Sequence, residues 1–476
     1  MARQIFATKS IDKLITESER PENSLRKTLG PVSLTALGIG AVIGSGIFTV
    51  IGTAIGGNPA QLAKWIDSPV VDLFLGWLHH TSGAVAGRPG AGPALALSLV
   101  LVAIVCALTG LCYAELASMI PIAGSAYTYT YATMGELIAW IIGWDLILEY
   151  AFSNMSVSVG FAAHVVDLLD WMGFHPNPKW LSPAFLPQGL QDLAGNDIYK
   201  PGWHAGFDIP AFLVVLLLTV VLVRGIRESA RTNNIMVLIK IAAILLFISF
   251  GAAFIHPENY HPFAPNGWTG VLAGGSIIFF TYIGFDSVST ASEECRNPRR
   301  DVPIGIVATL IVCTILYVGV AIVLTGIVPW KSVVGDGAPV VNALKRVSLL
   351  PAVFSGIHPR YRTPAFATWV AGILVAIPSG LFDVGTLAEM SNIGTLFAFV
   401  LVSAGVIILR YKDPGRHRGF RVPFGPVIPI LSVLCCILLM AGLPARTWIR
   451  FFVWLIIGLF VYVFYSRKRS EFYKAK

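Results

Sequence analysis

Near its start the chain reads Gly38-Ile39-Gly40-Ala41-Val42-Ile43-Gly44-Ser45-Gly46-Ile47-Phe48, with four glycines in a segment that is otherwise apolar enough to cross a bilayer. Glycine adopts non-helical dihedrals freely, so Gly44-Ser45-Gly46 predicts a helix that stops and restarts at membrane depth. Broken backbone is tolerated there only where it lines a hydrated cavity or where a ligand replaces the missing partners. The alternative is close helix packing, because Gly40 and Gly44 have the small-xxx-small spacing. The stretch alone supports both interpretations equally.

The composition is that of a polytopic membrane protein. Of the 476 residues 55% are hydrophobic and only 13% are charged, against about 25% charged in a soluble globular domain. The 34 Lys and Arg outnumber the 26 Asp and Glu, and we interpret this excess as membrane topology rather than nucleic-acid binding. The six cysteines lack metal-ligand spacing, and no nucleophile and base constellation is visible. We therefore expect neither an enzyme nor a cofactor or metal site.

Eleven apolar runs are long enough to span a bilayer, which takes about 20 residues each. They cover residues 32–56, 93–117, 137–169, 209–223, 234–255, 271–288, 303–328, 364–381, 388–409, 426–443 and 448–464. An insert of residues 57–92 separates the first two and is expected to be extracellular. It contains an amphipathic piece, residues 70–80, that we expect to lie on the membrane surface.

Basic residues test the topology. Six segments hold 24 of the 34 Lys and Arg: the tails 1–31 and 467–476, and residues 224–231, 296–300, 360–362 and 410–421. The positive-inside rule assigns all six to the cytoplasm. Strict alternation satisfies this only through the seventh span. Either the last four spans are inverted, which would export twelve basic residues, or a crossing between about residues 343 and 356 is missing.

Lys240 is the only charge in the apolar run of residues 235–247. A charge at that depth normally faces a cavity or a partner. Because a buried lysine can lose its proton, Lys240 is a candidate for proton coupling. The alternative is a permanently charged tether between helices.

Three acids in the spans are possible partners of Lys240. Asp145 and Glu149 share one helix face at i,i+4, where like charges repel, so they need a cation or a proton. Either could meet Lys240. Glu115 lies near the cytoplasmic end of the second span, and we favour an interfacial anchor over a gate. Glu389 is close enough to a span end to be ordinary.

A second interruption is predicted in the sixth span, which reads Phe279-Phe280-Thr281-Tyr282-Ile283-Gly284-Phe285-Asp286-Ser287. Two broken spans five apart are what an inverted repeat places across a shared midplane site. Free N–H groups after Gly44-Ser45-Gly46 suit a carboxylate, and free carbonyls at the end of the first half of the sixth span suit an ammonium. A site that offers both predicts an α-amino acid as the ligand.

Five motifs together resemble the amino acid, polyamine and organocation permeases, and most closely their bacterial cationic-amino-acid-transporter-like branch. They are Gly40-Ala41-Val42-Ile43-Gly44-Ser45-Gly46-Ile47-Phe48, Cys112-Tyr113-Ala114-Glu115-Leu116, Gly124-Ser125-Ala126-Tyr127-Thr128-Tyr129, Tyr282-Ile283-Gly284-Phe285-Asp286 and Arg296-Asn297-Pro298-Arg299-Arg300-Asp301-Val302-Pro303. The resemblance implies an all-α, leucine-transporter-type fold of two inverted five-helix repeats, residues 32–255 and 269–410, plus two helices in 424–466. It also implies alternating access.

The resemblance also implies roles for residues at the two breaks. Val42, Ile43, Gly44, Ser45 and Gly46 would hold the backbone groups of the substrate. Carbonyls of Phe280 and Ile283 would assist, with Phe280 also a gate, and Asp286 would line or brace the site. Lys240 falls where the branch carries a lysine that replaces a coupling sodium.

The chain departs from its family in one place. Family members have twelve spans, and their eighth helix would lie between residues 342–347 and 350–354 here, where no such helix is encoded. We therefore expect eleven spans and an incomplete second repeat. The prediction is a proton-coupled secondary transporter of amino acids in the cytoplasmic membrane, with its N-terminus inside, in contact with membrane lipid and not with nucleic acid. The alternative is a non-transporting amino acid sensor or degenerate paralogue. The substrate side chain and any accessory subunit stay open.

Overall fold

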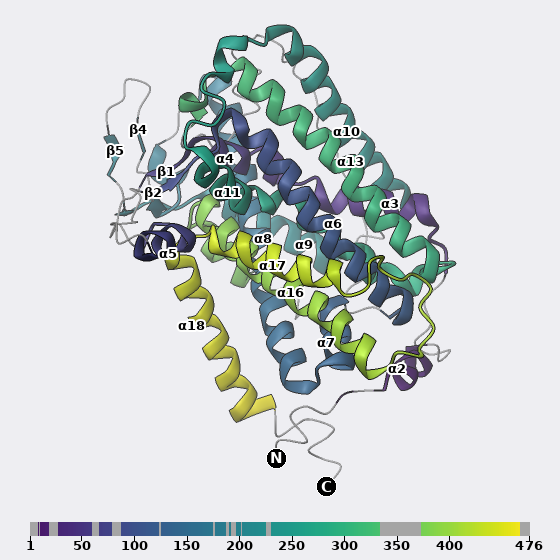
Figure 1. The fold of residues 1–476 in the computed structure, drawn as a ribbon. Coiled ribbons are helices and arrows are strands. Elements are labelled where there is room, and N and C mark those ends of the chain that lie inside the picture. The colour runs from purple at the N-terminus through teal and green to yellow at the C-terminus, as the bar shows by residue number, and fades with distance from the viewer. Residues whose placement is uncertain are drawn as a thin grey trace.

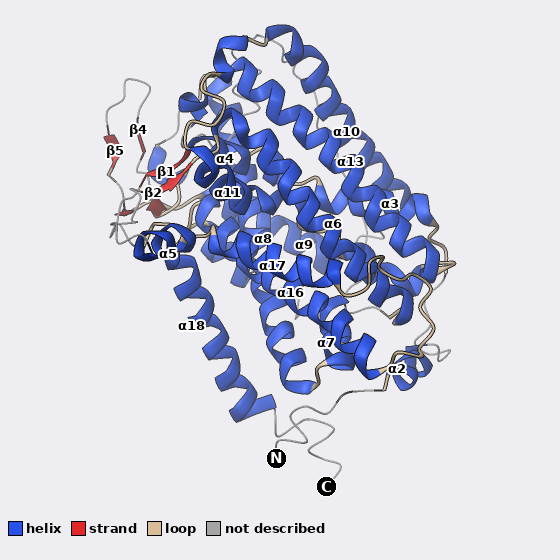
Figure 2. Cartoon of the chain, in the orientation of Figure 1, coloured by secondary structure: helices blue, strands red, loops and turns tan. Residues whose placement is uncertain are grey.

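The computed structural model describes residues 8, 10–18, 27–59, 66–78, 87–122, 125–174, 177–186, 190–191, 197–200, 202–224, 230–333 and 373–466. Helices make up nearly all of this, and short strands gather at one end (Figure 2). The first half contains α2 (Ile11–Ser18), α3 (Pro31–Val42), η1 (Ser45–Ile47), α4 (Val50–Gly56), β1 (Gly57–Pro59), α5 (Val70–Leu78), β2 (Gly87–Pro89), η2 (Gly92–Ala94), α6 (Leu95–Met119), α7 (Ser125–Thr133), α8 (Glu136–Trp171), η3 (Pro178–Trp180), β3 (Phe185–Leu186), β4 (Leu190–Gln191), β5 (Asp197–Tyr199), β6 (Gly202–Trp203), α9 (Ile209–Arg224), α10 (Ala230–Gly251), η4 (Ala252–Phe254) and η5 (Pro257–Tyr260).

The second half repeats the pattern of a broken helix followed by long ones. It contains α11 (Gly267–Ile278), η6 (Phe279–Tyr282), α12 (Ser287–Thr290), η7 (Ala291–Glu294), α13 (Pro298–Ile327), η8 (Trp330–Val333), a helical turn over residues 373–379, α16 (Val384–Lys412), α17 (Val427–Ala441), α18 (Ala445–Val461) and the π-helical η9 (Tyr462–Ser466). The strands form three antiparallel pairs, β1 with β2, β3 with β6 and β4 with β5. They lie outside the helical bundle.

The polytopic membrane architecture is confirmed. Within the described ranges, seven helices are long and apolar enough to cross a membrane, and α3, α9 and α17 contain shorter apolar helices at three further predicted spans. The predicted span 364–381 is described only from residue 373 onward. The segment expected to lack the eighth helix lies within residues 334–372, outside the described residues. The five-plus-five-plus-two arrangement with its eighth helix missing, and hence eleven spans, therefore stays a prediction.

Both interruptions that the glycines predict are present. α3 begins at a proline, which suits a first helical position, and ends at Val42, where Ile43 takes an extended conformation with ψ 92°. In the second half, Ile283 is extended with ψ 136°, and Gly284 has φ +114°, a conformation that disfavours any side chain. Each helix therefore breaks beside the glycines that predict the interruption.

The packing of the bundle brings the two halves together. α13 packs against α3 and α6, α11 against α4, and α16 against α8. In Figure 1, α18 stands at the edge of the bundle, beside α5 of the insert. The second broken helix therefore starts inside the bundle, whereas α3 is only partly buried and α18 has an exposed apolar face.

Three of the basic segments that the positive-inside rule assigns to the cytoplasm lie at the same end of the bundle. The backbone N–H of Arg296 donates to the carbonyl of Leu29 at 2.9 Å, next to the start of α3. Arg416 of the 410–421 loop pairs with Asp12 of α2. The N-terminal segment, residues 296–300 and the 410–421 loop are thus at the same end.

Candidate functional site

The two broken helices touch each other where their helical hydrogen bonding stops. A Cβ atom on Gly46 would lie 2.9 Å from Cγ2 of Thr281, and one on Gly284 would lie 2.9 Å from the carbonyl oxygen of Ala41. Both distances are shorter than normal van der Waals contact. Only glycine allows this close approach, so the predicted meeting of the two breaks is a property of the structure.

Tyr317 joins the two breaks from a third helix, α13. Its buried hydroxyl lies 2.9 Å from the carbonyl oxygen of Val42 and 3.0 Å from that of Thr281. It can donate its single proton to either carbonyl. Sequence analysis did not single out Tyr317, because one aromatic residue in an apolar helix looks like ordinary core.

Lys240 of α10 binds the end of α3. Its Nζ donates to the carbonyl oxygens of Gly40 at 3.0 Å and of Ile43 at 2.8 Å. The C-terminal end of a helix is its negative pole, so an ammonium is stabilised there. Among the residues that the structure places, Lys240 forms no ion pair, and Asp145 and Glu149 do not meet it as we had considered.

Asp145 and Glu149 face α16 instead. They are 0% and 1% exposed, and a Cβ on Gly394 of α16 would lie 3.0 Å from Oδ1 of Asp145. Within the described part of the chain, neither oxygen of Asp145 nor Oε1 of Glu149 has a hydrogen-bond partner. Burying an ionised carboxylate unpaired is very costly. The pair therefore needs a proton or a cation, as its spacing predicts.

Asp286 lies at the restart of the second broken helix and is buried. The side chain of Asp286 lies close to the hydroxyl of Tyr150, on α8. This contact ties the second break to α8. It suits the bracing role that the family resemblance implies for Asp286.

Some carbonyls at the second break are already used by side chains. Nδ2 of Asn392, on α16, donates to the carbonyl oxygens of Ser276 at 2.8 Å and Ile277 at 3.1 Å. The carbonyls of Ser276 and Ile277 are therefore occupied by a side chain of α16. The carbonyl of Phe280 accepts from the N–H of Ile283 at 3.4 Å, a long contact. The role of Asn392 had no signal in the sequence.

At the first break, the chain between α3 and α4 borders open space. A Cβ atom on Gly44 would have no other atom within 4 Å, whereas Gly46 is packed against the second break. Val42 and Ile43 are buried, and Ser45 opens the short helix η1. The structure thus brings the predicted residues Val42, Gly44, Gly46, Phe280 and Asp286 to one region.

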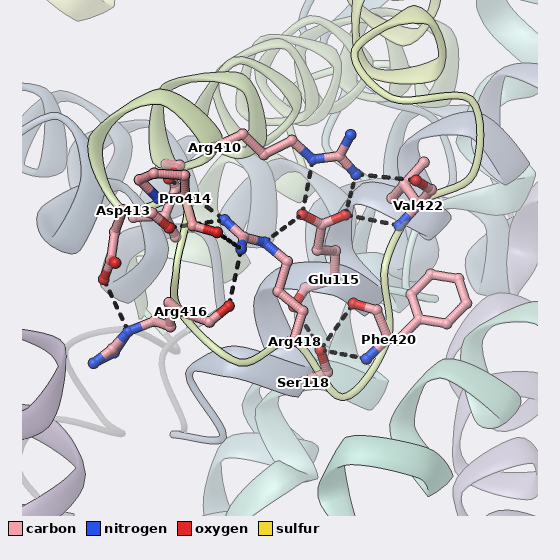
Figure 3. Close-up of polar contacts among 10 residues, drawn as sticks. Glu115, Ser118, Arg410, Asp413, Pro414, Arg416, Arg418, Phe420 and Val422 are labelled. Carbon is pink, nitrogen blue, oxygen red and sulfur yellow. Dashed lines mark hydrogen bonds and ion pairs between the residues drawn. The ribbon is translucent and has the colours of Figure 1, made fainter.

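Glu115 is the centre of an ion-pair cluster at the basic end of the bundle (Figure 3). Its carboxylate accepts from Arg410 on α16, from Arg418 at 3.2 Å and from the N–H of Val422 at 2.7 Å. Ser118, one turn further along α6, accepts from the N–H of Phe420 at 3.0 Å. We favoured an interfacial anchor for Glu115, and the structure shows a buried one that clamps the 410–421 loop onto α6.

Glu389 forms a second cluster at the opposite end of α16, so the expectation that it is ordinary is wrong. It is 0% exposed and accepts from Arg88 of the insert and from Thr447 of α18 at 2.9 Å. Arg446 lies 3.6 Å from it and also pairs with Asp67 at 2.8 Å. Glu389 and Arg410 are separated by about 31 Å of helix, the thickness of the hydrocarbon core. Ion pairs therefore hold α16 near both of its ends.

Two interrupted helices that meet inside a bundle, with a lysine on one break, define a helical membrane protein of the transporter class. Comparison with known proteins identifies the family. The amino acid permease model matches residues 29–348, and the model for the C-terminus of these permeases matches residues 420–470. The chain therefore belongs to the amino acid permease family, whose members are transporters and not enzymes.

Curated relatives match along the whole chain. The branched-chain amino acid permease BcaP of Bacillus subtilis (strain 168) is 40% identical over 509 positions, covering 99% of both chains. The methylthioribose transporter of the same organism is 39% identical over 505 positions, covering 98% of both. Human cationic amino acid transporter 4 is 30% identical over 83% of this chain and 62% of its own. The alignments of 505 and 509 positions exceed the 476 residues of the chain, so both bacterial relatives contain positions with no counterpart here.

Proposed function

We propose that this protein is a secondary transporter of amino acids in the cytoplasmic membrane, coupled to protons and working by alternating access. Its N-terminus is on the cytoplasmic side, because the basic segments at one end of the bundle follow the positive-inside preference. The family membership and the names of BcaP and of human cationic amino acid transporter 4 support amino acids as the substrate class. The transporter has two inverted repeats, with α3 to α10 in the first and a second that lacks one of its five helices.

The substrate is recognised through its backbone groups. The α-carboxylate binds N–H groups of residues 44–46, where Gly44 borders open space and the restarting helix presents its positive end. The α-ammonium binds the carbonyls of Phe280 and Ile283. Phe280, whose ring lies 3.2 Å from the position of a Cβ on Gly46, closes the site from one side.

The contact of Lys240 with α3 is the observation that carries proton coupling. As an ammonium, Lys240 makes two charge-assisted hydrogen bonds to the carbonyls of Gly40 and Ile43. Loss of its proton removes that charge and weakens both bonds. The proton on Lys240 therefore sets how firmly the end of α3 is held, and α3 forms one wall of the substrate site.

Uptake into proteoliposomes tests the coupling. The experiment compares wild type with Lys240→Met while an inward proton gradient is imposed or collapsed. Lys412→Met is the matched control, since Nζ of Lys412 also donates to a helix-end carbonyl, that of Thr133 at 3.0 Å, but far from either break. Wild type and Lys412→Met should respond to the gradient at least tenfold more than Lys240→Met. Equal stimulation of all three would refute coupling through Lys240.

The alternative function is amino acid binding without transport. It is favoured by the alignments that are longer than the chain, which agree with a segment missing relative to the relatives. The same preparation decides between the two functions. If amino acids raise the melting temperature of the purified protein while every flux stays at background, the protein is a sensor and not a transporter.

A further inference from the structure

Asn392 of α16 binds the carbonyl end of α11, the first half of the second broken helix. Its Nδ2 donates to the carbonyl oxygens of Ser276 at 2.8 Å and of Ile277 at 3.1 Å. All three residues are 0% exposed. The last four carbonyls of a helix have no partner within the helix, so a buried side chain that donates to two of them fixes where the helix ends.

Lys240 makes the corresponding contact on the first broken helix. Its Nζ donates to the carbonyls of Gly40 and Ile43 at the end of α3. In the inverted repeats that we propose, α10 is the last helix of the first repeat and α16 is the last helix of the second. Each repeat therefore uses a donor from its last helix to hold the end of its own broken helix. The two donors differ in one respect, because a lysine can lose a proton whereas an asparagine amide stays neutral.

The part of α16 that carries Asn392 is itself held by two other helices. The hydroxyl of Ser391, the preceding residue, shares a hydrogen bond of 2.6 Å with the hydroxyl of Ser153 on α8. Glu389, less than one turn earlier, accepts from the hydroxyl of Thr447 on α18 at 2.9 Å. Asn392 therefore acts from a segment that is fixed to α8 and α18, and its two hydrogen bonds fix the end of α11 to the same segment.

The carbonyls that we assign to the substrate ammonium follow the end of α11 directly. α11 ends at Ile278, and the short helix η6 starts at the next residue. The carbonyl of Ile278 accepts from the hydroxyl of Thr281 at 2.8 Å, which joins the two helices across their boundary. Because no flexible linker separates α11 from η6, a shift of the end of α11 moves the carbonyls of Phe280 and Ile283 with it.

We propose that Asn392 is a positioning residue of the substrate site, which fixes the end of α11 and thereby the carbonyls of Phe280 and Ile283 that receive the α-ammonium. Asn392 acts through α11 and does not itself touch the amino acid. This inference rests on the proposed function, since it takes the second break as the place where the ammonium binds. Asn392 therefore contributes to the preference for an ammonium over a neutral group at that position of the substrate.

Two substitutions of Asn392 and one matched control test this role. Oδ1 of Asn392 has no hydrogen-bond partner among the described residues, so the amide is held through its nitrogen. Asn392→Asp keeps the size of the side chain but replaces that nitrogen with an oxygen, and a carboxylate only accepts. Asn392→Leu removes the amide without adding a charge, and it serves if the aspartate variant does not fold. Asn266→Asp is the control, because Nδ2 of Asn266 donates to the carbonyl of Gly90 at 2.8 Å at the opposite end of α11.

Ligand discrimination is the first measurement. Thermal shift with the twenty common L-amino acids identifies those that wild type binds, and each of these is compared with the 2-hydroxy acid of the same side chain. The hydroxy acid keeps the carboxylate and replaces the ammonium by a neutral hydroxyl. Asn266→Asp should keep the wild-type preference for the amino acid, whereas both Asn392 variants should lose at least fivefold of it. A merely structural role of Asn392 would weaken both compounds in proportion, and an unchanged preference overturns the proposal.

Hydrogen exchange is the second measurement and needs no substrate. The amides of residues 279–286 should exchange at least fivefold faster in both Asn392 variants than in wild type, and at the wild-type rate in Asn266→Asp. Equal exchange in all four proteins overturns the proposal whatever the binding data. If wild type binds none of the amino acids while exchange follows the expectation, the proposed function fails, and with it the assignment to the ammonium, whereas the role of Asn392 in fixing α11 stands.

Discussion

Replacing Tyr317 by phenylalanine should weaken the contact between the two broken helices while the aromatic ring stays packed in place. The substitution removes only the hydroxyl, which bridges the carbonyl oxygens of Val42 and Thr281. Both carbonyls belong to stretches where helical hydrogen bonding is already interrupted. No neighbouring side chain takes over the role of Tyr317 within the described ranges, so at least one buried carbonyl is left without a partner.

The free-energy cost of Tyr317→Phe follows from the carbonyl that loses its hydrogen bond. A buried polar group left unpaired costs about 1–3 kcal/mol. Because 1.4 kcal/mol corresponds to a factor of ten, the closed arrangement of the two breaks should become about fivefold to 150-fold less favoured. If the amino acid binds only when the two breaks are in contact, its apparent affinity should fall by a comparable factor.

Tyr282→Phe is the matched control. Tyr282 is also fully buried and its ring packs edge-on against Tyr317 at 5.4 Å, but its hydroxyl contacts Leu99 and Thr314, away from the first break. Thermal stability and uptake into proteoliposomes are measured for both variants. Both should lose some stability, whereas only Tyr317→Phe should raise the substrate concentration for half-maximal uptake by fivefold or more. The same uptake constants in both variants would refute a specific role for the Tyr317 bridge.

Two further predictions concern charged groups outside the breaks. Glu115→Gln removes the carboxylate that Arg410 and Arg418 share, and this should cost about 3–5 kcal/mol of stability because a buried ion pair is broken. The melting temperature of Glu115→Gln should therefore fall far more than that of Asp413→Asn, whose ion pair with Arg416 is half exposed. Equal shifts in the two variants would contradict this. Asp208 caps α9 by accepting from the N–H of Ala211 at 2.9 Å, and burial raises its pKa to about 7. Because the folded state prefers the protonated acid, the stability contributed by Asp208 is full below its unfolded pKa near 3.8 and is lost as the pH rises to 7, by about 1.4 kcal/mol per pKa unit. Asp208→Asn should therefore melt at an increasingly higher temperature than wild type between pH 4 and pH 7, and a constant difference would show that Asp208 does not titrate there.

For the described residues, the sequence by itself determined which segments form long apolar helices and where two of them break. Apolar length decides the first property, and the observed α6, Leu95–Met119, and α13, Pro298–Ile327, contain or closely match the predicted spans 93–117 and 303–328. Glycine decides the second, because its freedom at positive φ is a property of the residue itself. Gly284 has that conformation, and Gly46 permits the close contact with Thr281.

Only the tertiary structure decided which polar groups meet. Glu389 looked ordinary in sequence, yet its partner Arg88 is 301 positions away, and Tyr317 reaches Val42 across 275 positions. The same holds for Asn392 and for the orientation of Asp145 and Glu149 toward α16. Local sequence sets which residues share a helix face. The partner of that face is set by how helices from distant parts of the chain pack, because each buried polar group must find a partner in the one arrangement that also fills the apolar core.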